Sequence, residues 1–155
     1  MAVPGAIKFA SPLPDTFTAK FQLCHEATFQ IRISDLLVVM NSWAGWQISG
    51  WNNLQVAGLS AGDPWGICHA TQRWPNGKFY SAPKEVVPLE ISVKEGRVTL
   101  IYNGRYMLDN VLLENPRSSY TLSFETWGGE WLTLGVNSIV PGVALPREKK
   151  LHPVR

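Results

Sequence analysis

Apolar and polar residues alternate with a period of two along several segments of the chain. Phe29, Ile31 and Ile33 alternate with polar side chains, and residues 89–93 repeat this pattern. Because successive side chains of a strand point to opposite faces, each segment predicts a strand with one buried face. The short apolar run at residues 36–40, which contains β-branched valines, predicts another strand.

Glycine-containing turns separate several of these segments. Glu95-Gly96, Asn103-Gly104 and Gly128-Gly129 each stand between two segments of this kind. Asn-Gly is a strong hairpin signal, because both central positions of a type I′ turn need positive φ angles. All three turns therefore predict hairpins. The strands expected on this basis are 28–34, 36–40, 89–94, 97–102, 105–108, 120–126 and 131–136.

The remaining sequence offers little sign of helix. No segment combines the i, i+3, i+4, i+7 apolar stripe with helix start and stop signals. Residues 43–88 are rich in Trp, Gly, Pro and Asn, and Pro75-Asn76-Gly77 predicts a turn between strands near 68–74 and 78–81. The pattern therefore predicts an all-β protein built as one antiparallel β-sandwich.

The sequence shows no internal repeat and no domain boundary within residues 1–140, which we expect to form a single domain. From Pro141 onward, three prolines and the basic run Arg147-Glu148-Lys149-Lys150 predict an extended or mobile tail over 141–155. The basic run is short, so we expect a solvated tail rather than a phosphate-binding segment.

Length and composition agree with this picture. The chain has 155 residues, of which 45% are hydrophobic, enough for one domain with a real core. The net charge of +2 gives no electrostatic reason to expect nucleic acid as a partner. No run approaches the roughly 20 apolar residues of a membrane span. The first residues lack the apolar run of a signal peptide, which predicts a cytoplasmic protein or one exported without such a signal.

The two cysteines stand in similar dipeptides, Cys24-His25 and Cys68-His69. The recurrence suggests a zinc site. Adjacent residues of a strand point to opposite faces, however, so one dipeptide rarely supplies two ligands to one ion. We therefore expect buried free thiols, no metal and no cofactor.

Tryptophan is the unusual component of the composition. Five of the seven tryptophans fall in one turn-rich stretch, at positions 43, 46, 51, 65 and 74. Sugars present apolar C–H faces ringed by hydroxyl groups, so stacking on Trp with hydrogen bonds from Asn, Gln and Arg suits them. The alternative is that several of these rings fill the core. Loops carry function on β scaffolds, which favours at least one Trp facing a ligand.

Catalysis has little support in the sequence. A glycosidase needs two carboxylates across a cleft, and the nearest candidates, Glu125 and Glu130, flank the Gly128-Gly129 turn. We interpret both as surface carboxylates. The three histidines lie far apart in the sequence, and no nucleophile, zinc-protease or phosphate-loop motif is present. These observations favour a protein that is not an enzyme.

The order of the expected strands resembles a galectin-like carbohydrate-recognition domain, a jelly-roll sandwich related in shape to concanavalin. Residues 37–42 (Leu-Val-Val-Met-Asn-Ser) are similar to the family strand that ends in Asn-Ser. Residues 89–106 resemble its paired strands with the Asn-Gly turn, and 120–136 resemble its closing strands. The resemblance covers about 28–48 and 86–137. It implies sugar binding on one sheet, with β-galactosides as the family's ligands, without a metal or covalent chemistry.

The resemblance also implies site residues. Asn41 matches the family's sugar-binding Asn, and Trp46 matches the Trp that stacks on the sugar, with Trp43 as a rival. The family's His-x-Asn-Pro-Arg strand has no counterpart here. If 28–34 is the equivalent strand, Gln30 and Arg32 stand on its outward face, although Arg32 is equally explained as a charge that keeps that face wet. The family's Trp-Gly-x-Glu is likewise replaced, by Trp-Gln-Ile-Ser at 46–49.

The sequence therefore predicts a jelly-roll sandwich acting as a non-enzymatic lectin whose partner is a glycan or glycoconjugate. The residues expected to contact the sugar are Gln30, Arg32, Asn41, Trp43, Trp46 and Asn52. Two alternatives stay open. One is a structural or protein-interaction module, including a homodimer. The other is a polysaccharide-cleaving enzyme that uses Glu125 or Glu130.

Overall fold

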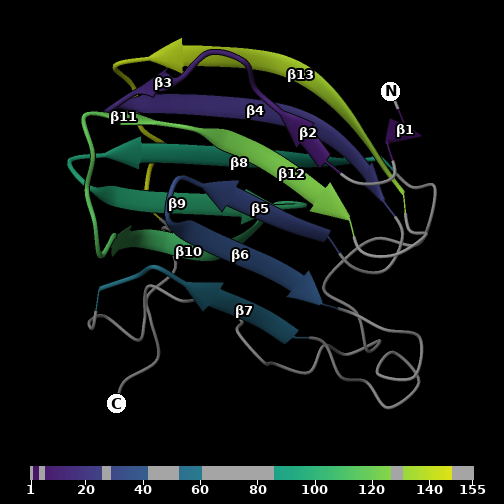
Figure 1. Ribbon diagram of the computed structural model, residues 1–155, viewed down its shortest axis with the longest axis horizontal. Coiled ribbons are helices and arrows are strands. Elements are labelled where there is room, and N and C mark those ends of the chain that lie inside the picture. Colours follow the sequence, from purple (N-terminus) through teal and green to yellow (C-terminus); the bar gives the residue numbers. More distant parts are fainter. Residues whose placement is uncertain are drawn as a thin grey trace.

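The computed structural model describes residues 2–3, 6–25, 29–41, 53–60, 86–126 and 131–147, and these residues form strands and turns without any helix (Figure 1). The strands are β1 Ala2–Val3, β2 Ala6–Lys8, β3 Leu13–Pro14, β4 Phe17–His25, β5 Phe29–Ile33, β6 Leu36–Asn41, β7 Asn53–Ala57, β8 Val87–Lys94, β9 Arg97–Tyr102, β10 Arg105–Leu112, β11 Ser119–Tyr120, β12 Leu122–Thr126 and β13 Leu132–Pro141. Within this part of the chain, no helix has the length and apolarity that crossing a membrane requires.

The strands form two stacked antiparallel sheets. The six-stranded sheet has the order β1-β13-β4-β8-β9-β10, and the five-stranded sheet has the order β2-β12-β5-β6-β7. A short pair, β11 with β3, lies beside them. In Figure 1 the five-stranded sheet lies in front of the six-stranded one. The predicted all-β antiparallel sandwich is confirmed.

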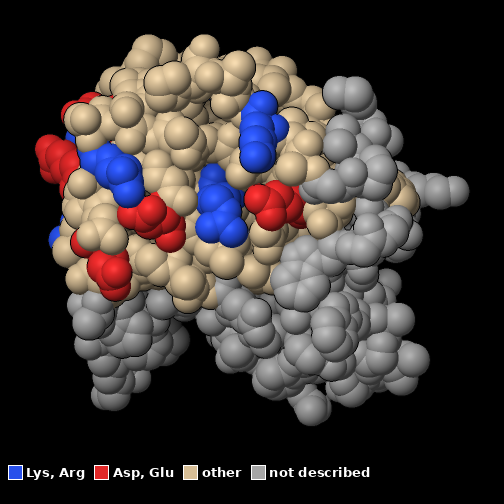
Figure 2. All heavy atoms as spheres, in the orientation of Figure 1, with Lys and Arg blue, Asp and Glu red and all other residues tan. Residues whose placement is uncertain are grey.

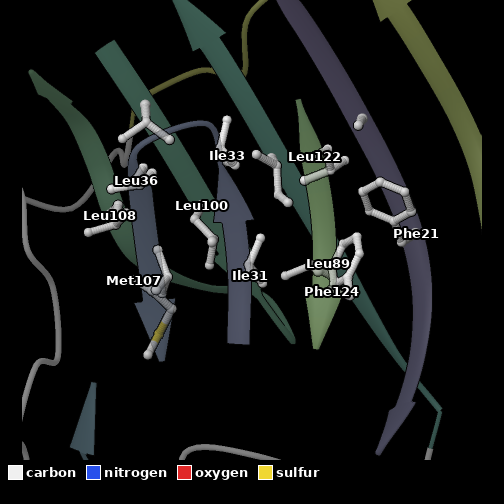
Figure 3. Packing of buried hydrophobic residues seen from close by; sticks show 14 of the residues in the cluster. Phe21, Ile31, Ile33, Leu36, Leu89, Leu100, Met107, Leu108, Leu122 and Phe124 are labelled. Carbon is white, nitrogen blue, oxygen red and sulfur yellow. The ribbon is translucent and has the colours of Figure 1, made fainter. Parts of the chain in front are cut away.

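The core lies between the two sheets. Phe21 and Leu89 of the six-stranded sheet point toward Ile31 and Phe124 of the five-stranded sheet, and all four are buried (Figure 3). The rings of Phe21 and Phe124 meet edge to face, with centroids 5.3 Å apart. Burying one such side chain stabilises the fold by about 1.5–3 kcal/mol. The apolar positions of the alternating segments are thus the ones that face the core.

Two of the three predicted hairpins are confirmed. Glu95 and Gly96 join β8 to β9 with φ angles of 51° and 72°. Asn103 and Gly104 join β9 to β10 with φ angles of 50° and 78°. All four residues lie in the left-handed region, as a type I′ turn requires.

The third predicted hairpin is wrong. β12 pairs with β2 and β5 in one sheet, whereas β13 pairs with β1 and β4 in the other. A glycine pair permits a turn but does not choose the pairing partner, which depends on the apolar faces that each strand can bury. Phe124 aligns with Ile31 of β5, and β13 runs beside the whole of β4.

The sequence interpretation also missed β4, although it carries a regular alternation. Phe17, Ala19, Phe21 and Leu23 are buried, and the residues between them point to the outer face. β4 holds the centre of the six-stranded sheet between β13 and β8. Because β4 was not predicted, the strand at 131–136 was paired with its neighbour in the sequence, β12.

Cys24 and His25 lie at the end of β4 and face opposite ways, as expected for neighbours in a strand. Cys24 is a free thiol, as predicted, but it is half-buried, so the prediction that it is buried is wrong. His25 is buried, and its Nε2 lies 2.7 Å from the hydroxyl of Tyr102. Cys68 and His69, together with the strands and turn expected at 68–81, lie outside the described residues.

The first part of the expected tail lies extended against the outer face of the six-stranded sheet. Thr18 Oγ1 donates a hydrogen bond of 2.6 Å to the carbonyl of Val143. The backbone N–H of Leu145 donates to Ser92 Oγ at 3.0 Å, and the hydroxyl of Tyr106 donates to the Pro146 carbonyl at 2.9 Å. β13 itself continues to Pro141. The domain boundary at 140 stays a prediction, since residues 148–155 lie outside the described part of the chain.

Candidate functional site

The outer face of the five-stranded sheet brings polar residues from separate strands into register. Lys8 of β2, Ser123 of β12 and Arg32 of β5 form one row across three adjacent strands. Glu125 and Gln30 pair in the next row. These positions face outward because their neighbours along each strand, such as Ile31 and Phe124, are buried in the core.

Glu125 is the centre of a small polar network on this face. Gln30 Nε2 donates a hydrogen bond to Glu125 Oε2. Arg32 Nε lies 3.8 Å from Glu125 Oε1, which is an ion pair beyond hydrogen-bond length. One carboxylate therefore holds both side chains that the sequence predicted for this strand. Figure 2 shows basic and acidic side chains close together near the centre of this face, with further charged side chains toward the left edge of the view.

Exposure differs within the network. The side chains of Arg32 and Glu125 are 44% and 29% exposed, whereas Gln30 is 8% exposed. An ion pair this open to water contributes about 0–1 kcal/mol to folding, so stability alone gives little reason for it. The pair leaves the guanidinium of Arg32 accessible to a ligand.

The face becomes apolar on the side of β6. Arg32 aligns with Leu37, which is half-buried, and Gln30 aligns with Val39, which is buried. A surface that combines charged donors with neighbouring aliphatic groups suits a ligand that itself has polar and apolar sides. Sugars have this character.

The predicted site residues divide into two groups. Gln30 and Arg32 lie side by side on the outer face, as expected for alternate residues of one strand. Asn41 is the last residue of β6 and pairs with Asn53 of β7. Trp43, Trp46 and Asn52 lie outside the described residues, so their place in the site stays a prediction.

Three residues of this face were not predicted as part of a binding site. Glu125 was interpreted as a surface carboxylate, with catalysis as the alternative, and Lys8 and Ser123 were not considered. The alternation of 122–126 does place Ser123 and Glu125 on one side of a strand. The missing information was the pairing of β12 with β5, across about 90 residues of chain. Glu130 lies outside the described residues.

The opposite face of the molecule has a hollow of about 270 Å³ beneath the tail, and it is a weaker candidate site. Val140, Val143 and Leu145 make its lining mainly apolar. Two of its three polar side chains have partners: Thr18 bonds to the tail, and Lys20 lies 3.5 Å from Glu90. Few groups remain there to hydrogen-bond a ligand.

The described residues contain no group of three or more His, Cys, Asp or Glu side chains close enough to hold a metal ion. What this part of the chain offers a ligand is therefore hydrogen bonding, charge and apolar contact. The outer face of the five-stranded sheet combines all three.

Comparison with known proteins adds information about the fold. No protein-family model matches the sequence, and no curated protein is significantly similar to it. Among solved structures, the galectin LEC-6 of Caenorhabditis elegans is similar, with a TM-score of 0.51 and 17% identity over 88% of this chain and 91% of that one. A proposed glycosyl hydrolase from Parabacteroides distasonis has a TM-score of 0.51 and 12% identity, over 92% of this chain and 80% of that one. The chain therefore has a galectin-like β-sandwich fold, as its resemblance to that family indicated.

Proposed function

We propose that this protein is a non-enzymatic carbohydrate-binding protein whose site is the outer face of the five-stranded sheet, centred on Arg32. The observation that carries the proposal is the network in which Glu125 holds both Arg32 and Gln30 on an accessible surface. The galectin-like fold supports it, since the similar LEC-6 is a galectin.

The geometry suits sugar hydroxyl groups. The contact with Glu125 engages Nε of Arg32, and the two terminal nitrogens of the guanidinium carry four further N–H donors. Gln30 is more buried than Glu125 and donates a hydrogen bond to the same carboxylate, which orients Glu125.

The apolar side of the sugar would lie toward β6. Leu37 is the next residue in the row after Arg32 and provides aliphatic surface there. Trp46, or its rival Trp43, would be the stacking ring, with Asn41 and Asn52 as further hydrogen-bond partners. Each of these four assignments rests on the sequence.

Polysaccharide cleavage is the second candidate, favoured by the exposed Glu125 and by the fold shared with a proposed glycosyl hydrolase. A glycosidase needs a second carboxylate within about 10 Å. Asp35 lies in the turn beyond β5, five residues past the Gln30 that pairs with Glu125, which corresponds to about 16 Å along a strand. Asp35 is therefore too distant to act with Glu125, and cleavage would need a carboxylate such as Glu130, which lies outside the described residues.

The test is a glycan array with the whole protein, followed by titration of the hits while intrinsic Trp fluorescence is recorded. We expect saturable binding that Arg32→Met weakens at least about tenfold, since a hydrogen bond to a charged group contributes about 1.5–3 kcal/mol. Arg117→Met is the matched control, because Arg117 forms a similarly exposed ion pair, with Asp35 at 2.6 Å, at the end of the sheet.

The alternatives predict other results. A blank array from folded protein, together with a mass that rises with concentration in light scattering, would support a protein-interaction module or homodimer instead. Release of reducing ends from a glucan that Glu125→Gln abolishes would establish cleavage. Equal glycan binding by wild type and Arg32→Met would reject Arg32 as the centre of the site.

A further inference from the structure

The candidate site has more positive than negative charge. On the outward positions of β2, β12 and β5, the described ionisable residues are Lys8, Arg32 and Glu125. Glu125 is paired with Arg32, whereas Lys8 is exposed and makes no ion pair with any described residue. The face therefore carries one net positive charge, at its β2 side.

The two cations flank Ser123. Ser123 aligns with Lys8 on one side and with Arg32 on the other. Two strand spacings separate the backbones of Lys8 and Arg32, which is about 10 Å. Both side chains are long enough to reach inward over the short Ser123 from this distance. An anionic group above Ser123 could thus receive N–H donors from both.

From this arrangement we infer that the site prefers glycans with an anionic substituent, a sulfate or a carboxylate, placed over Ser123 between Lys8 and Arg32. The inference rests on the proposed carbohydrate-binding function and specifies its ligand class. The planar guanidinium of Arg32 matches the paired oxygens of a sulfate or carboxylate, and the ammonium of Lys8 adds a point charge.

The position of Glu125 orients the ligand. Glu125 lies two residues from Ser123 along β12, so its carboxylate is within about 7 Å of the proposed anion position. Its repulsion keeps the anionic substituent in the row of Ser123, between Lys8 and Arg32, and the neutral part of the sugar extends from there over Leu37. The same ligand then has its charged end over β12 and its apolar face over β6.

The experiment uses the whole protein and matched oligosaccharides that differ only in one sulfate or one carboxylate. We expect the acidic member of a pair to bind about three- to tenfold more tightly than the neutral one at low ionic strength. This advantage should shrink as salt is raised, because the charges are exposed to solvent. Separate sulfate and carboxylate derivatives distinguish the two anions.

Lys8→Gln should remove most of the preference for the acidic member, so that the affinity for the acidic member falls more than the affinity for the neutral one. Lys94→Gln is the matched control, because Lys94 is an exposed lysine on β8 of the other sheet. It should leave both affinities unchanged.

The outcomes separate this inference from the proposed function. Equal affinity for acidic and neutral members, or a preference that survives Lys8→Gln, would overturn the inference while sugar binding stands. No binding to any member would overturn both. Competition by a single-stranded DNA oligonucleotide of matched charge, as strong as that by the acidic glycan, would also overturn the inference, since the face would then be a general anion-binding surface.

Discussion

The imidazole of His25 and the hydroxyl of Tyr102 lie 2.7 Å apart in the interior of the sandwich. Both residues are buried, and they come from β4 and β9, which are separated by β8 in the six-stranded sheet. The ring of His25 also packs 4.5 Å from that of Phe29 in the opposite sheet. This polar pair therefore links two strands of one sheet and contacts the other.

Tyr102→Phe removes the hydroxyl of this pair and leaves an imidazole nitrogen in the core without that partner. We expect a loss of about 1–3 kcal/mol in the free energy of unfolding, measured by urea denaturation. Tyr106→Phe is the control, since the Tyr106 hydroxyl bonds to the Pro146 carbonyl at an exposed position and its loss should cost less. Equal losses in the two variants would contradict a special role for the buried pair.

Arg32 should matter for binding and little for folding. Its ion pair with Glu125 is exposed, so Arg32→Met is expected to change the free energy of unfolding by less than about 1 kcal/mol. The check is thermal unfolding of Arg32→Met beside Arg117→Met, whose ion pair is similarly exposed. A much larger loss for Arg32→Met would mean that the network serves the fold.

The tail should stabilise the domain through Arg147. Its Nε lies 3.5 Å from Oδ1 of Asp109, and this carboxylate is 1% exposed. Arg147→Met removes the positive charge that faces the buried carboxylate of Asp109. We expect a loss of about 1 kcal/mol in the free energy of unfolding. This is less than for a fully buried ion pair, because Arg147 is itself exposed. Urea denaturation measures this loss. In the Asp109→Asn background, where no charge is left to compensate, the same change should have a smaller effect.

Gly58 should tolerate no side chain. Its φ angle is +96°, and a Cβ there would lie 2.5 Å from the carbonyl oxygen of Asp35. We expect Gly58→Ala to cost about 2 kcal/mol or more, because both the backbone conformation and the space are unfavourable. Gly104→Ala is the control: its φ of +78° is also positive, but no atom lies within 4 Å of the added Cβ. A similar loss of stability in both variants would show that conformation alone decides the effect.

The outer face of the five-stranded sheet shows which part of a site is readable from sequence. Gln30 and Arg32 were predicted together, because alternate residues of one strand share a face. Glu125 was interpreted as a surface carboxylate or, in the alternative, a catalytic one, whereas the structure shows it in contact with both of them. Lys8 joins the same face through Ser123, and no local pattern connects these residues with Arg32.

The predicted glycine-containing turns also show that a local sequence signal does not decide which strands pair. Two of these hairpins were confirmed and one was wrong. Glu95-Gly96 and Asn103-Gly104 join strands that pair with each other, so a local signal sufficed. The strands on either side of Gly128-Gly129 belong to different sheets. Whether a turn closes a hairpin or crosses between sheets depends on where the apolar faces of its two strands find partners.

By itself, the sequence determined the segments that form β5, β6, β8, β9, β10, β12 and β13, which of their residues face the core, and the tight turns at 95–96 and 103–104. These properties depend on period-two alternation and on φ preferences, which act between neighbours in the chain. Only the tertiary structure decided that β12 lies between β2 and β5, and β13 beside β4. Those pairings form because two sheets must bury their apolar faces against each other, a condition met by all the strands together. These pairings place Arg32 beside Glu125 and in the same row as Lys8.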